Sequence, residues 1–349
     1  MMTSLSSQTH LTRRQLFAAA GKAGLAVGAL AAVNGVVPRM VSAKPNDNKH
    51  KPKKGDIDIL RFLAAAEIIE TDLWDQYCEL AMNNDAFREA MESIDDDMPA
   101  YICDNTADER SHADFLNAYL ASIGAMPVDL EPFRTLTPPA VTGLESRPRL
   151  TNLTNLNVDT SWVERYLGSG NPDFGDTFDQ VVTINNRPTI PTSDGLTDDQ
   201  VLAVAYAAAF HFGSIEQGGT SLYPQMLPRT RSMDAIRIVA AIGPTEAWHL
   251  TIWRDQIGKI KALDAGNGLV FPDLSADEDI VEHVMPNPCK FFDASLPLCS
   301  VVRPTSQGHA GAVAAATFLR DSGLFTGQSQ AFFNALNSLA VAADAAERD

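Results

Sequence analysis

Two short stretches decide the fold of this chain: Glu109-Arg110-Ser111-His112 and Glu246-Ala247-Trp248-His249, which share the spacing Glu-x-x-His. Residues three apart lie on one face of an α-helix, so each stretch directs a carboxylate and an imidazole to the same side. Two such helices that face each other bring four metal-ligand side chains together. One Glu-x-x-His is common by chance, but two of them in helical segments indicate a bundle built around a metal site.

Four segments have the apolar spacing of amphipathic helices, and their ranges are 56–83, 100–123, 197–222 and 232–263. The third begins with a capping-box pattern at Thr197, and the second ends at Gly124, a usual helix stop. We therefore expect an all-α fold in which these segments form a four-helix bundle.

The four segments carry acidic and imidazole side chains in a regular order. A glutamate on the first and third helices alternates with Glu-x-x-His on the second and fourth, which is the ligand order of bundles that hold two iron or manganese ions. Taken singly, each residue is better explained as a satisfied polar group or part of a solvated helix face, whereas the complete set favours metal binding. The candidate ligands are Glu67, Glu109, His112, Glu216, Glu246 and His249.

The surroundings of these candidates are apolar. Glu67 follows three alanines, and Glu216 lies in the segment 205–223, which has no other Asp, Glu, Lys or Arg. A carboxylate in such company has to be paired, protonated or metal-bound. Four carboxylates balance the charge of two divalent ions, and one histidine per ion leaves positions open for water, dioxygen or peroxide. Iron and manganese accept the same ligands, so both are compatible with this set.

Around these ligands the chain resembles the ferritin-like superfamily, and in particular its exported branch of desiccation-related and fungal sexual-development-associated proteins. The resemblance covers 56–126 and 197–263. It implies Glu67 as the ligand of the first helix with Glu70 as its neighbour, and it places Trp74, where the family usually has a tyrosine, and Tyr223 beside the site. The residues that carry the resemblance are Glu67-Ile68-Ile69-Glu70 with Trp74, Glu216 with Gly219 and Tyr223, and Glu246-Ala247-Trp248-His249.

Three other histidines are weaker candidates. His211 lies five residues before Glu216, which is about 140° around a helix, so we expect it in the core or behind the ligands. His283 and His309 have no ligand spacing, and we expect structural roles for them.

The organisation of the rest of the chain follows from its composition. The stretch 127–196 is rich in Pro, Asn, Thr and Gly and is expected to be an irregular crossover between the second and third helices. Aromatic residues within it, among them Trp162, Tyr166, Phe174 and Phe178, indicate that the crossover packs against the bundle. The remainder, 264–349, is expected to be a loop-rich extension with helices at 310–320 and 328–346.

The first residues are typical of an export signal. Arg13-Arg14 precedes the apolar run 18–37, and Val41-Ser42-Ala43 offers a cleavage site. We expect residues 1–43 to be a twin-arginine signal peptide and 44–55 a flexible linker, which places the protein in the periplasm or outside the cell and off the membrane after cleavage. An uncleaved membrane anchor is the alternative, since the run is long enough to span.

Net charge, cysteine content and the lack of certain motifs argue against several classes of function. A net charge of −17 argues against nucleic acid or anionic membrane as a partner. There are four cysteines, enough for two disulfides. A Cys289–Cys299 disulfide is the first expectation, and Cys78 and Cys103, which lie on successive helices, could also form one. No Gly-rich phosphate loop or Gly-x-Ser-x-Gly motif is present.

Two functions remain. The first is an exported protein with a dinuclear iron or manganese centre that carries out redox chemistry on dioxygen or peroxide. The second is a non-catalytic, stress-protective or cell-envelope scaffold in which any metal is structural or vestigial. Cage-type iron storage is disfavoured, because the crossover and the C-terminal extension would obstruct cage packing.

Overall fold

The computed structural model describes residues 51–165, 178–282, 285–290, 293, 295–302 and 310–346. The expected signal peptide, the linker up to residue 50, His283, His309, and Tyr166 and Phe174 of the crossover lie outside the described residues. Within the described part, no helix combines the length and apolarity needed to cross a bilayer.

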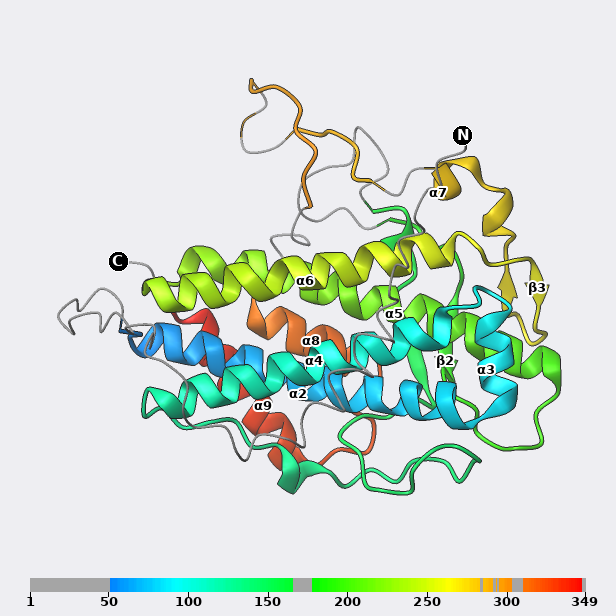
Figure 1. The fold of residues 1–349 in the computed structure, drawn as a ribbon, viewed down its shortest axis with the longest axis horizontal. Helices are drawn as coiled ribbons and strands as arrows, with labels where there is room; N and C mark the ends of the chain where they lie inside the picture. Colours follow the sequence, from blue (N-terminus) through cyan, green and yellow to red (C-terminus); the bar gives the residue numbers. More distant parts are fainter. Residues whose placement is uncertain are drawn as a thin grey trace, which may run out of the picture. The chain divides into compact units, whose positions relative to one another are not determined.

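Four long helices form the bundle, as the sequence predicts. They are α2 (Lys54–Asn83), α4 (Met98–Ser122), α5 (Asp198–Met226) and α6 (Met233–Ile257). Figure 1 shows α2 packed along α4 and α5 along α6, and α4 also contacts α6. The capping box at Thr197 is present, and Ser232 caps α6 by accepting from the backbone N–H of Ala235. The fold class is therefore confirmed.

The helix ends differ from the predicted ones where local capping was missed. A short helix, α3 (Asp85–Glu92), follows α2 directly, because the Asn84 side chain accepts from the Phe87 amide at 2.9 Å and restarts the helix. In addition, α5 runs on past Pro224 to the 3₁₀ turn η3 (Leu227–Arg229). The fourth helix ends earlier than predicted, with Gly258 as its C-cap.

The crossover packs down on the bundle, and Trp162 anchors it. Its regular elements are η1 (Glu131–Phe133), β1 (Leu156–Val158), η2 (Ser161–Val163) and β2 (Ile184–Arg187), with β1 and β2 antiparallel. The buried Trp162 indole donates to the Phe210 carbonyl on α5 at 2.9 Å. A Cβ atom at Gly213 would lie 2.2 Å from the Trp162 ring, so α5 has a glycine where the indole lies against it.

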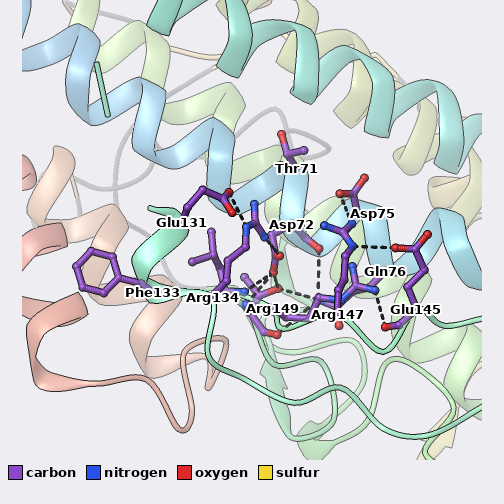
Figure 2. A network of polar contacts seen from close by, with 12 residues as sticks. Thr71, Asp72, Asp75, Gln76, Glu131, Phe133, Arg134, Glu145, Arg147 and Arg149 are labelled. Carbon is purple, nitrogen blue, oxygen red and sulfur yellow. Dashed lines mark hydrogen bonds and ion pairs between the residues drawn. The ribbon is translucent and has the colours of Figure 1, made fainter. Parts of the chain in front are cut away.

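A second anchor is a network of arginines from the crossover on acidic residues of α2, shown in Figure 2. The fully buried Asp72 pairs with Arg134 and accepts from the Leu150 and Thr151 amides at 2.9 and 2.8 Å. Beside it, Arg147 pairs with Asp75 at 2.7 Å. Buried ions are tolerated only when paired, so this network fixes the path of the crossover along α2.

The C-terminal extension begins with short elements and ends with the two expected helices. Of these, α9 packs against both α2 and α8. Phe332 of α9 makes an edge contact with Phe133 of the crossover, with ring centroids 5.7 Å apart. The elements are β3 (Leu263–Asp264), β4 (Val270–Phe271), η4 (Leu274–Ala276), α7 (Glu278–Glu282), α8 (Ala312–Asp321) and α9 (Gln330–Asp344).

The disulfide expected between Cys289 and Cys299 is wrong. These two are free thiols, whereas Cys78 of α2 and Cys103 of α4 form a disulfide with Cα atoms 5.0 Å apart. Cys289 and Cys299 do pair through their backbones, in an isolated antiparallel bridge. Their thiols point to different environments, however, because Cys289 is buried and Cys299 is exposed.

Candidate metal centre

The structure brings all six candidate ligands together in the bundle. Every one is buried, with at most 8% of the residue exposed. Helix α2 contributes Glu67, α4 contributes Glu109 and His112, α5 contributes Glu216, and α6 contributes Glu246 and His249.

The six side chains form two overlapping groups of four. The first consists of Glu67, Glu109, His112 and Glu246, and the second of Glu109, Glu216, Glu246 and His249. Within each group the ligand atoms lie within 4.8 Å of one another. Since Glu109 and Glu246 belong to both groups, the cluster defines two adjacent positions that share two carboxylates.

Both histidines turn Nδ1 toward the carboxylates. His112 Nδ1 lies 3.3 Å from Glu67 Oε2, 3.2 Å from Glu109 Oε2 and 3.3 Å from Glu246 Oε1. His249 Nδ1 lies 3.0 Å from Glu109 Oε1 and 3.2 Å from Glu216 Oε2. Each imidazole therefore serves one of the two positions.

Unsatisfied oxygens show that the cluster fits metal ions. Both carboxylate oxygens of Glu246, and Oε2 of Glu67, are buried and make no hydrogen bond. Burying such atoms without a partner is unfavourable, and a cation in either position would supply one. The chain also leaves room for Glu246, because a Cβ atom at Gly219 would lie 2.3 Å from Glu246 Oε2.

Burial and mutual repulsion shift the ionisation of the cluster. Burial and the neighbouring Glu216 raise the pKa of Glu109 to about 7, and burial with the charge of Glu109 raises the pKa of Glu246. Burial acts to lower the pKa of both histidines. The hydrogen bond of His112 to Glu109, and for His249 the charge of Glu216, outweigh burial, so both pKa values are raised. The metal-free cluster therefore holds protons, which bound cations would displace.

Tyr223, Trp74 and Glu70 are the residues predicted to lie beside the ligands, and all three are buried. Tyr223 donates its hydroxyl to Glu67 Oε1, and Trp74 is fully buried and stacks on Trp253 with centroids 5.4 Å apart. Glu70 is buried and belongs to neither group of four; burial, and then the charge of Glu109, raise its pKa.

His211 lies outside both groups. Its Nδ1 is 2.8 Å from the Tyr77 hydroxyl on α2, and burial lowers its pKa to about 3. His211 is therefore a neutral histidine of the core. The sequence predicted that it would lie either in the core or behind the ligands.

Two residues at the cluster were missed by the sequence reasoning. Asn105 donates to Glu109 Oε1 at 2.7 Å and to Glu216 Oε1 at 2.9 Å, while its own oxygen accepts from the Trp253 indole at 2.9 Å. Asp108 Oδ2 lies 3.2 Å from His249 Nε2. Asn105 precedes Glu109 by four residues and so shares its helix face, which is the signal that could have found it.

Fold and site together define a class, that of helical bundles with a buried carboxylate–histidine cluster able to hold a metal centre. A family model for the ferritin-like domain matches residues 55–259, which is more than half of the chain. The chain belongs to this ferritin-like family. Searches of curated proteins and of solved structures found no match.

Proposed function

We propose that this protein binds two ions of iron or manganese between α2, α4, α5 and α6 and uses them for redox chemistry on dioxygen or peroxide. One observation carries the proposal, namely that Glu109 and Glu246 each belong to both groups of four. Carboxylates shared in this way can bridge two ions. A site for a single ion has no need of shared carboxylates.

In this proposal the ligands divide into two positions. The Glu67/His112 position and the Glu216/His249 position each have one glutamate and one histidine of their own, and Glu109 and Glu246 lie between them. The four carboxylates offset the charge of two divalent ions. The cysteines of α2 and α4 offer no thiolate to the ions, because they are joined in a disulfide.

The chain's own residues would set the conditions for the reaction. Bound iron or manganese would supply one-electron redox chemistry. Tyr223, whose pKa is raised by burial and by the charge of Glu67, holds its proton on the hydroxyl that it donates to Glu67. Trp74, Trp253 and Phe212 pack against one another next to Asn105 and exclude water from that side.

Metal analysis of protein purified from its own export route tests the proposal. We expect two ions of iron or manganese per chain, and consumption of dioxygen or peroxide by the loaded protein. His112→Gln with His249→Gln should abolish both. His211→Gln, which changes a buried histidine outside the site, is the matched control. Wild-type protein that contains no such metal and takes up neither Fe²⁺ nor Mn²⁺ refutes the proposal.

We further propose export by the twin-arginine route, with residues 1–43 removed, as in the exported branch of the family. Arg13-Arg14 ahead of an apolar run supports it. Replacing both arginines by lysine should leave the precursor in the cytoplasm, as fractionation and N-terminal sequencing would show. Export of that variant at the normal level contradicts this route.

The burial of the ligands supports a second candidate, a non-catalytic scaffold in which the ions are structural. None of the six ligand residues is more than 8% exposed, so little of their surface is open to a substrate. In that case metal removal would lower the melting temperature, and the loaded protein would consume neither dioxygen nor peroxide.

A further inference from the structure

The two cluster histidines are held differently on their outer sides. His249 Nε2 lies 3.2 Å from Asp108 Oδ2, a carboxylate on the neighbouring helix α4. No hydrogen bond joins His112 Nε2 to any residue in the described part of the chain. The sequence explains the asymmetry, because Asp108 directly precedes Glu109 whereas Thr245 occupies the same place before Glu246.

The two glutamates that belong to one position each, Glu216 and Glu67, both have a hydrogen-bond partner. Asn105 donates to Glu216 Oε1 at 2.9 Å, and the Trp253 indole holds Asn105 in place. Tyr223 donates to Glu67 Oε1. The Glu216/His249 position therefore has outer partners on both of its own ligands, and the Glu67/His112 position has one only on its glutamate.

We infer that Asp108 is a positioning residue for His249, and that the Glu216/His249 position binds its ion more tightly than the Glu67/His112 position and fills first. The inference rests on the proposed function. A carboxylate that accepts from Nε2–H fixes the tautomer with the Nδ1 lone pair directed inward, and it makes that nitrogen a stronger donor. Among the described residues, His112 has no such carboxylate, so its imidazole has to adopt this tautomer when the ion binds.

The size of the effect follows from comparable sites. Loss of an outer partner of a metal-binding histidine typically costs roughly 10- to 100-fold in affinity. The Asp108 side chain is 55% exposed, so solvent weakens its interaction with His249. We therefore expect the lower end of that range, about 10-fold.

Titration of the metal-free full chain with Mn²⁺ under anaerobic conditions, followed by calorimetry, tests the inference. Two separate binding steps in the wild type would not by themselves support the inference, because repulsion between the two ions also weakens the binding of the second. His112→Ala should leave one tight ion, which Asp108→Asn then weakens by about 10-fold. His249→Ala should leave one weaker ion, which Asp108→Asn does not change. Glutamine at either histidine replaces alanine where the alanine variant fails to fold by circular dichroism.

Asp114→Asn is the matched control, since it removes the same charge from an exposed site on the same helix. It should leave the affinities for both ions unchanged, and the metal-free Asp108→Asn protein should fold as judged by circular dichroism. The inference is overturned when Asp108→Asn weakens the ion equally in both histidine backgrounds. It is also overturned when Asp114→Asn has the same effect, or when the ion left by His249→Ala is the tighter. Wild-type protein that binds no Mn²⁺ refutes the proposed function, and the inference with it.

Discussion

Replacing Gly219 by alanine should separate the demands of the helix from those of the metal centre. An alanine Cβ at this position of α5 would lie 2.3 Å from Glu246 Oε2, whereas ordinary contact begins at 3.4 Å. The carboxylate would therefore have to retreat by about 1.1 Å, the difference between these two distances. Ligand distances in metal sites are held to roughly 0.2 Å, so such a retreat removes Glu246 from at least one position.

The neighbouring Gly218 provides a matched control. It is exposed, and a Cβ atom there would meet nothing within 4 Å. Alanine is favoured over glycine in a helix by about 1 kcal/mol, so Gly218→Ala should raise the melting temperature of the metal-free protein by about 2 °C. Its affinity for metal should equal that of the wild type.

For Gly219→Ala we expect the affinity for Mn²⁺ to fall by at least about 10-fold. Stability of the metal-free protein should change little, because the gain in helix propensity offsets the strain of moving Glu246. Thermal unfolding with and without Mn²⁺, together with calorimetric titration, measures both quantities. Gly219→Ala protein that binds Mn²⁺ as tightly as Gly218→Ala protein would refute the reasoning that this glycine makes room for a ligand.

Three further predictions concern stability, each measured by urea unfolding. Burial lowers the pKa of His211 to about 3, below the unfolded value near 6.5, so its contribution is present above pH 6.5 and is lost as the pH falls. The wild type should lose about 1.4 kcal/mol more than His211→Gln between pH 7.5 and 5.5, and equal losses would contradict this. Cys78→Ser opens a disulfide between residues 25 apart and should cost about 3 kcal/mol, whereas Cys289→Ser should not change the effect of reductant. Asp72→Asn should cost about 3–5 kcal/mol, because it leaves buried partners of the carboxylate unpaired, and the exposed Asp85→Asn less than about 0.5 kcal/mol.

The bundle could be predicted from sequence because each of its helices carries its own signals. Apolar spacing located all four helices, and the cap at Thr197 marked the start of α5 to within a residue. The two Glu-x-x-His stretches identified the side chains that meet in the structure, since the spacing alone places each pair on one helix face. That these side chains bind metal remains a prediction.

The missed features depend on contacts between elements rather than on any one element. Asp108 reads as a surface charge until α6 brings His249 to 3.2 Å from it. Asn105 matters only because Glu216 arrives from α5. The sequence allowed a Cys78–Cys103 disulfide but favoured Cys289–Cys299, and only the packing of α2 on α4 shows which pair is joined. Strands β1 and β2 have three and four residues, too few for alternation to be recognised.

The disulfide between α2 and α4 has a consequence for how the protein matures. It staples one pair of helices, and the short turn between α5 and α6 joins the other. The stapled pair carries Glu67, Glu109 and His112, and the second pair carries the other three ligands. Each group of four draws on both pairs, so neither pair alone supplies a complete set of four ligands. On the proposed function, the ions would therefore join the two helix pairs, and each site would be complete only after the pairs have packed together.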